Sequence, residues 1–257
     1  MIPACFYITC AFILGLMIGS FLNVCIYRMP RERSIVTPPS SCPSCGNRIA
    51  FYDNIPVLSF IILRGRCRNC NAVISWRYPA VEIMSGVLAA LLMYKLGLTL
   101  EFLFSYVFCA SLIVVSLIDL DYQIIPNEIS LPGIVVFFAY SFFSSRLPWK
   151  ASLLGIVFGG GILALIAVFY YLLTRTEGMG MGDVKLLAMI GAFLGIEGVI
   201  FTLVVGSILG SIFGIVLTLR DKGDRKTKVP FGPFLSIGAV AAVFFGGILF
   251  DLYFGMM

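Results

Sequence analysis

The 257-residue chain contains no histidine. This absence excludes a Ser-His-Asp triad, a Cys-His pair and a catalytic metal held by imidazole, because each of these devices needs a histidine ring. Any acid–base chemistry must therefore depend on carboxylates, lysine, tyrosine or cysteine.

Charge is also scarce. Charged residues make up 12% of the chain and hydrophobic residues 60%, which is too little polar surface for a water-soluble globule. Since a bilayer span needs roughly 20 apolar residues, we expect an all-α, polytopic membrane bundle of about eight transmembrane helices. The first apolar run, residues 4–27, should stay in the mature protein, because no basic residue precedes it as in a cleavable signal peptide. The expected spans are 4–27, 79–98, 101–120, 126–145, 150–173, 183–196, 198–219 and 232–255.

The distribution of lysine and arginine predicts the orientation. If the N-terminus is extracytoplasmic, the cytoplasmic loops collect 15 basic residues and the outer loops collect three, which fits the preference of basic loops for the cytoplasm. Both termini are then expected outside and the working face inside. The basic clusters lie at predicted membrane boundaries, so they indicate contact with lipid head groups and no nucleic-acid binding.

One segment, residues 28–78, is soluble in character and contains two Cys-x-x-Cys pairs. Four thiolates suit tetrahedral Zn²⁺, and the predicted cytoplasmic location disfavours the alternative of two disulfides. We therefore predict a small cytoplasmic domain stapled by a structural zinc ion, because about 50 residues are too few for a core of their own. The predicted ligands are Cys42, Cys45, Cys67 and Cys70.

Two aspartates from distant parts of the chain are expected at one membrane level. Asp119 lies at the cytoplasmic end of the third predicted span, and Asp183 lies at the cytoplasmic start of the sixth. A carboxylate at membrane depth is costly, which makes it a functional candidate, although either residue could simply face head groups. When two carboxylates share a site, one keeps a proton while the other stays ionised, which is the chemistry of aspartic proteases.

The stretch before the second aspartate supports this interpretation. Gly178, Gly180 and Gly182 alternate directly before Asp183, and glycine permits close backbone approach of an extended peptide. Lys185 could support substrate binding or catalysis, or could extend to the surface. A carboxylate-based proton or cation transporter is an alternative function, but it has no evident use for the cysteine pairs.

Several motifs together resemble the bacterial type IV prepilin peptidases, a family of G-x-G-D membrane aspartic proteases. The motifs are GSFLNVCIYRMP at 19–30, the two cysteine pairs, ISWRYPAVE at 74–82, IDLDYQIIPN at 118–127 and GMGDVK at 180–185. In that family the first catalytic aspartate lies seven residues before the proline of the I-P element. This spacing selects Asp119 over Asp121, and the second catalytic residue is Asp183.

The resemblance implies two activities at the bacterial inner membrane. The first is cleavage after a glycine of the basic leader of type IV prepilins or type II secretion pseudopilins, and the second is N-methylation of the new terminus with S-adenosylmethionine. A G-x-G-D protease without methylation is the nearest alternative. The implied partition is a first transmembrane helix at 1–27, a methyltransferase-associated zinc domain at 28–78 and a peptidase domain at 79–257. Residues in the family-like stretches that we expect at the cofactor are Asn23, Arg28, Gly65 and Glu82.

The two aspartates also differ in the helix end that each occupies. Asp119 closes a helix, where the negative end of the dipole favours the neutral acid, and Asp183 opens one, where the positive end favours the anion. On this reasoning, Asp183 activates water and Asp119 donates a proton, although a coupled pair titrates jointly.

Overall fold

The computed structural model describes residues 4–175, 180–220 and 230–254, with the side chains of 218, 220 and 247–254 left out. The long elements in these ranges are all helices, which confirms the predicted all-α class. The only β-structure found there is a pair of isolated bridges, Ser41 with Arg48 and Arg66 with Val73. The chain groups into two compact units, residues 1–114 and 115–257, which are described separately below.

The first unit pairs two membrane helices with the loop between them. Helix α1 spans Ala4–Arg28, α3 spans Arg77–Leu96, and the connecting loop contains the short helices η1 (Met29–Arg31), η2 (Phe51–Asn54) and α2 (Leu58–Ile62). Glycines allow α1 and α3 to pack closely, since a Cβ on Gly15 would lie 2.8 Å from the Cα of Gly86. Helix α4, Leu100–Tyr122, begins in this unit and ends in the next.

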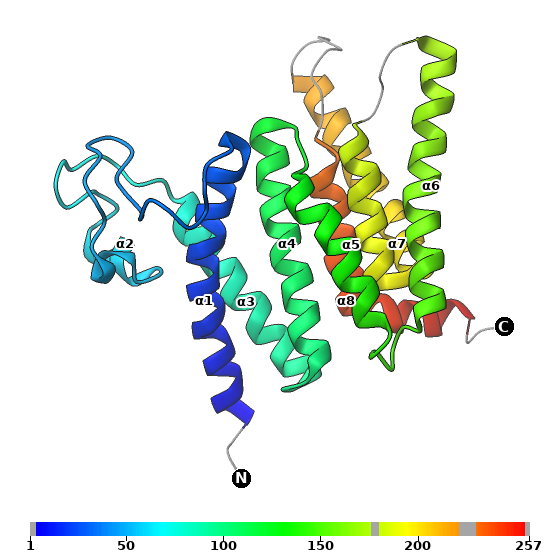
Figure 1. Cartoon of the computed structure of the whole chain (residues 1–257), viewed down its shortest axis with the longest axis horizontal. Coiled ribbons are helices and arrows are strands. Elements are labelled where there is room, and N and C mark those ends of the chain that lie inside the picture. Colours follow the sequence, from blue (N-terminus) through cyan, green and yellow to red (C-terminus); the bar gives the residue numbers. More distant parts are fainter. Residues whose placement is uncertain (1–3, 176–179, 221–229, 255–257) are drawn as a thin grey trace. The chain divides into compact units, whose positions relative to one another are not determined.

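The second unit contains the end of α4 and four further helices. These are α5 (Asn127–Ser141), α6 (Trp149–Thr174), α7 (Met181–Arg220) and α8 (Gly232–Phe254). Helices α5, α6 and α7 lie side by side, and α8 packs on α7 (Figure 1). Gly155 of α6 faces Gly191 of α7 with almost no space between the two backbones, because neither residue has a side chain.

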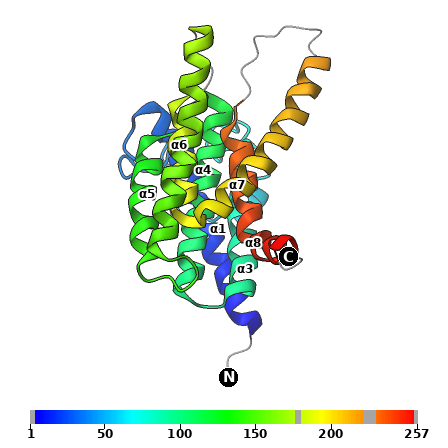
Figure 2. The same ribbon diagram turned by 90° about the vertical axis from the view of Figure 1, so that its right-hand side faces the viewer.

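Helix α7 is broken at Gly195. This residue has φ 71° and ψ −171°, a backbone conformation that only glycine adopts at little cost. The chain changes direction there, so residues 181–194 and 196–220 form two diverging arms (Figure 2). The first arm packs on α6 and the second packs on α8, where Gly206 lies against Phe234.

The helices begin and end close to the predicted spans. The sixth and seventh predicted spans correspond to the two arms of α7, with the break at Gly195 instead of residue 197. With α7 counted as one element, five described helices are long and apolar enough to cross a membrane. A multi-pass membrane protein is therefore confirmed, whereas the count of eight spans and the functional partition at residues 27 and 78 stay predictions.

Candidate active site and metal centre

Asp119 is buried at the end of α4. Its side chain is 6% exposed, and its Oδ2 atom accepts a hydrogen bond of 2.9 Å from the backbone N–H of Gly232. Gly232 is the first residue of α8, so the carboxylate takes up a donor that has no partner within its own helix. Asp121, two residues later, is exposed. Burial therefore favours Asp119 over Asp121, as does the spacing of Asp119 from Pro126.

Asp183 lies half-buried in the first turn of α7. Its backbone N–H donates to the carbonyl of Gly180 at 3.2 Å, which closes the start of the helix. The carboxyl groups of Asp119 and Asp183 are near enough for their charges to interact. Both residues belong to the second unit, so one compact body holds the pair together.

The helix ends around the two aspartates do not identify which of them acts as the base. Asp119 lies in the last turn of α4, but its carboxylate also accepts the first N–H of α8. The positive end of one helix therefore offsets the negative end of the other at this residue. Each aspartate meets a helix N-terminus, and the dipoles alone do not decide which one gives up its proton.

The glycines before Asp183 have different surroundings. A Cβ on Gly182 would lie 2.9 Å from the Cβ of Ile125, so the absence of a side chain lets α7 pack on the segment before Pro126. A Cβ on Gly180 would come no closer to another residue than 3.9 Å, and Gly178 lies outside the described residues. Gly182 thus has a packing role that the peptide-approach hypothesis did not foresee.

Lys185 contacts a neighbouring helix instead of the aspartates. Its Nζ atom donates a hydrogen bond of 2.8 Å to Oδ1 of Asn127, the first residue of α5. This contact joins the starts of α5 and α7 on the side of Pro126. A supporting role for Lys185 therefore stays a prediction, with Asn127 as its described partner.

The four cysteines converge, as their spacing predicted. Their sulfur atoms all lie within 4.8 Å of one another, and Sγ of Cys42 is 3.8 Å from Sγ of Cys70. Tetrahedral coordination at a Zn–S distance of about 2.3 Å places sulfurs roughly 3.8 Å apart. The donor set and its spacing therefore fit a tetrahedral metal ion, with all four positions filled by protein.

Two similar turns build the cysteine cluster. In the first turn the N–H of Gly46 donates to the carbonyl of Cys42, and in the second the N–H of Asn71 donates to the carbonyl of Cys67. Gly46 and Asn71 each follow the second cysteine of a pair and have φ values of 71° and 57°. Glycine and asparagine are the residue types that tolerate this left-handed conformation best. The local sequence thus shapes each turn to direct two sulfurs inward.

Backbone donors prepare one sulfur to bind a cation. The N–H groups of Cys45 and Ser44 lower the pKa of the Cys42 thiol to about 6, so it is ionised at neutral pH. The N–H of Ala72 lowers the pKa of Cys70, but burial and the neighbouring thiols outweigh it and raise this pKa to about 11. The backbone around Cys42 therefore favours the thiolate, which is the form that binds a metal ion.

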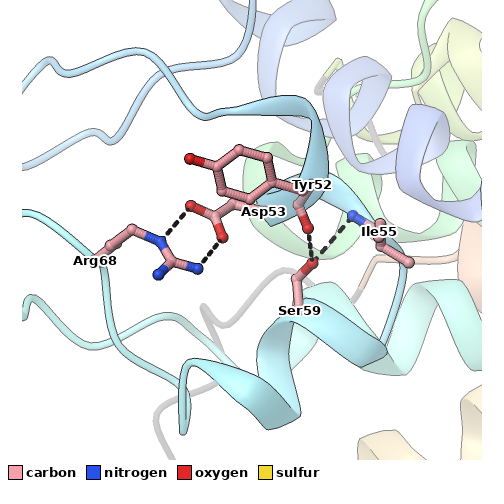
Figure 3. A network of polar contacts seen from close by, with 5 residues as sticks. All are labelled: Tyr52, Asp53, Ile55, Ser59 and Arg68. Carbon is pink, nitrogen blue, oxygen red and sulfur yellow. Dashed lines mark hydrogen bonds and ion pairs between the residues drawn. The ribbon is translucent and has the colours of Figure 1, made fainter.

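An ion pair fastens the second turn to the rest of the loop. Arg68, between Cys67 and Cys70, donates from Nε and Nη2 to the two oxygens of Asp53, at 2.8 and 2.6 Å (Figure 3). Arg68 lowers the pKa of Asp53 through these hydrogen bonds, and both groups are charged at neutral pH. The planar, two-bond geometry fixes the direction of η2 relative to the cysteine cluster.

The same network holds α2. Ser59 is buried, and its hydroxyl donates to the carbonyl of Tyr52 at 2.9 Å while accepting the N–H of Ile55 at 3.1 Å (Figure 3). One side of this short helix therefore faces η2.

The four residues predicted at the cofactor each have a described contact within the first unit. Asn23 donates to the carbonyl of Tyr78 at 3.0 Å, and Glu82 accepts the N–H of Val57 at 2.7 Å, so both brace the first unit internally. Arg28 donates to the carbonyls of Ser34 and Pro38 at 2.9 and 2.7 Å. Gly65 is buried against the ring of Phe60. Their place at the methyl donor therefore stays a prediction.

Sequence reasoning missed Gly232. The signal was available in part, because Pro233 is typical of a first helical turn and marks the start of α8. Its partner lies 113 residues earlier, so only the fold reveals the contact.

Comparison with known proteins places the chain in a family. Residues 13–96 match the bacterial peptidase A24 N-terminal domain, and residues 106–215 match the type IV leader peptidase family. A prepilin leader peptidase/N-methyltransferase from Pseudomonas putida is 38% identical, with 94% of this chain and 91% of the relative covered. The protein of that name from Pseudomonas aeruginosa is 34% identical, with 93% of this chain and 91% of the relative covered. The one from Burkholderia pseudomallei strain 1026b is 33% identical, with 95% of this chain and 87% of the relative covered. No solved structure matches.

An apolar helical bundle with a buried and a half-buried aspartate that interact, and with no histidine, has the features of a membrane aspartic peptidase. More particularly, the chain belongs to the prepilin leader peptidase/N-methyltransferase family.

Proposed function

We propose that this protein removes the leader of type IV prepilins or type II secretion pseudopilins after a glycine and then N-methylates the new terminal residue. Membership of the family supports both activities. The observation that carries the cleavage step is the buried carboxylate of Asp119 interacting with that of Asp183 in one compact unit.

Asp119 and Asp183 share one proton in the proposed cleavage. The ionised member removes a proton from a water molecule, and the resulting oxygen attacks the carbonyl carbon of the glycine before the cleavage site. The protonated member donates to the carbonyl oxygen. Breakage of the C–N bond then gives a leader that ends in a carboxylate and a mature chain whose new amine has taken up a proton.

Gly232 positions Asp119 for this reaction. Its N–H occupies one lone pair of Oδ2 and so holds the carboxylate in a single orientation. A Cβ on Gly232 would lie 2.7 Å from that oxygen, which makes glycine the residue that fits here.

The metal at the cysteine cluster is proposed to be zinc. It would be held by Cys42, Cys45, Cys67 and Cys70, and it would fix the loop rather than take part in the reaction, because no coordination position stays open. S-adenosylmethionine would supply an electrophilic methyl group for transfer to the new N-terminal amine, with S-adenosylhomocysteine as the leaving group and one proton lost from the amine.

We further propose eight membrane spans, with both arms of α7 crossing and the aspartates at the cytoplasmic face. The excess of basic residues in the predicted cytoplasmic loops supports this orientation. Asp119 at the end of α4 and Asp183 at the start of α7 then lie at the same membrane face as the basic leader of the substrate.

The test incubates the purified protein with a prepilin peptide and S-adenosylmethionine labelled in its methyl group. Cleavage after the glycine together with label on the new terminus is the expected result. Cleavage without label would indicate a membrane protease alone, and the absence of both would favour a carboxylate-based transporter.

A further inference from the structure

The four-cysteine loop exposes an apolar and cationic surface with no described partner. This surface, here named the Trp76 surface, consists of Ile61, Arg64, Arg66, Val73 and Trp76, which line one hollow of about 500 Å³. Ile61 is 64% exposed, Val73 81% and Trp76 76%, which is unusual for large apolar side chains gathered at one place. Such a patch marks a surface that something else covers.

Local contacts fix the direction in which this surface points. Ser59 is buried on the inner side of α2, while Leu58, Ile61 and Ile62 are exposed. The ring of Phe60 packs on that of Trp76 at 4.6 Å between centroids, which joins α2 to the start of α3. The exposed apolar side chains are therefore held outward by a braced loop.

The loop lies beside a membrane helix rather than beyond its end. Val57, just before α2, donates its N–H to Glu82 of α3, whose Cα would lie 2.7 Å from a Cβ on Gly19 of α1. Gly19 is nine residues before Arg28, or about 14 Å along the helix. Figure 1 shows the same arrangement, with α2 level with the body of α1. The chain thus enters α2 at a depth where α1 is within the bilayer.

The residue types match the region between head groups and acyl chains. Trp76 immediately precedes α3, a helix long and apolar enough to cross a membrane, so its indole lies where that span begins. Tryptophan is enriched at this level of the bilayer, and arginine beside it meets lipid phosphates. Arg64 and Arg66 are exposed and make no side-chain hydrogen bond or ion pair within the described part of the chain.

We propose that α2 and the Trp76 surface insert into the interfacial layer of the bilayer, with Arg64 and Arg66 on the phosphates of anionic lipids. The four-cysteine loop then lies against the membrane instead of standing in the cytoplasm. This inference depends on the membrane location of α1 and α3 and not on the proposed reaction.

The test uses the two tryptophans of the chain. The substitution Trp149→Phe leaves Trp76 as the sole tryptophan and alters nothing in the loop. The variant is reconstituted in vesicles of phosphatidylcholine and phosphatidylglycerol whose acyl chains carry bromine, which quenches indole only on contact. We expect bromine near the ester end to reduce Trp76 fluorescence at least twofold, and bromine near the chain end to have less effect.

Two other outcomes would overturn the proposal. Quenching by acrylamide from the water phase, with none by bromine, would place Trp76 in solvent. Quenching by neither agent would show that protein, such as a second copy of the chain, covers the surface. The companion variant Trp76→Phe retains Trp149 and reports whether the protein inserted correctly.

Substitutions on the surface test the contributions of charge and apolar contact. In the Trp149→Phe background, Ile61→Asp should at least halve the quenching by bromine, whereas Asn47→Asp adds the same charge at an exposed site of the other cysteine turn and should change nothing. Quenching should increase with the share of phosphatidylglycerol in the vesicles, and replacing both Arg64 and Arg66 by glutamine should remove this increase. Equal quenching in all these proteins would refute the assigned contacts.

Discussion

Alanine at Gly232 should impair cleavage by displacing the carboxylate of Asp119, which we propose to be catalytic. The new Cβ would lie 2.7 Å from Oδ2 of Asp119, whereas ordinary contact begins at 3.4 Å. The carboxylate must therefore move by about 0.7 Å. Misplacing a reacting group by about 1 Å costs up to 100-fold in rate. We expect kcat/KM for a prepilin peptide to fall by about 10- to 100-fold, which corresponds to roughly 1.4–2.7 kcal/mol.

The matched control is Gly246→Ala on the same helix. A Cβ there meets no atom of the described residues within 4 Å, so cleavage should stay within about twofold of the wild type. Alanine forms helices better than glycine does, so a loss of activity at position 232 would not reflect a weaker α8. Wild-type kcat/KM in a correctly inserted Gly232→Ala protein would refute the positioning role.

Three further variants test the site and the metal centre. Asp183→Asn should lower cleavage by roughly 10²- to 10⁴-fold in a peptide assay, because the proton-sharing pair is lost. Asp121→Asn, at an exposed position, should keep nearly full activity, and equal losses would refute the choice of residues. Cys42→Ser should abolish bound zinc, measured by elemental analysis, and expose the loop to limited proteolysis, since the folding of a small metal loop depends on its ion; full zinc content would contradict the ligand set. Gly182→Ala should reduce cleavage, because its Cβ would lie 2.9 Å from that of Ile125. Gly180→Ala should not, because its Cβ would come no closer than 3.9 Å to the described residues. A larger loss for Gly180→Ala than for Gly182→Ala would favour the peptide-approach hypothesis instead.

The apolar runs made most of the helices predictable. Each predicted span has a helical counterpart, since long uninterrupted hydrophobic segments leave no alternative in a bilayer. The break in α7 was predicted within two residues because Gly195 lies between two apolar runs. Helix α2 was missed, because an apolar stretch of five helical residues is too short for a span and was read as soluble loop.

The site was predictable where sequence spacing carries chemistry. The cysteine pairs indicated a cluster because four thiols at this spacing have one common use, and Asp119 was separated from Asp121 by its distance to Pro126. The contact of Asp119 with Gly232 could not be predicted, since it depends on how α4 and α8 end in space. Glu82 accepts the N–H of Val57, a contact that the sequence did not indicate, and its place at the cofactor stays a prediction.

The break at Gly195 means that a rotation of the first arm of α7 about this residue would move Asp183. Asp183 lies 12 residues from that pivot, or about 18 Å along the helix, so a swing of 10° would shift its carboxylate by about 3 Å. The close packing of Gly155 on Gly191 restrains such a swing near the pivot, and the contacts of Gly182 and Lys185 restrain it near Asp183. The position of Asp183 therefore depends in part on two distant residues that have no side chain.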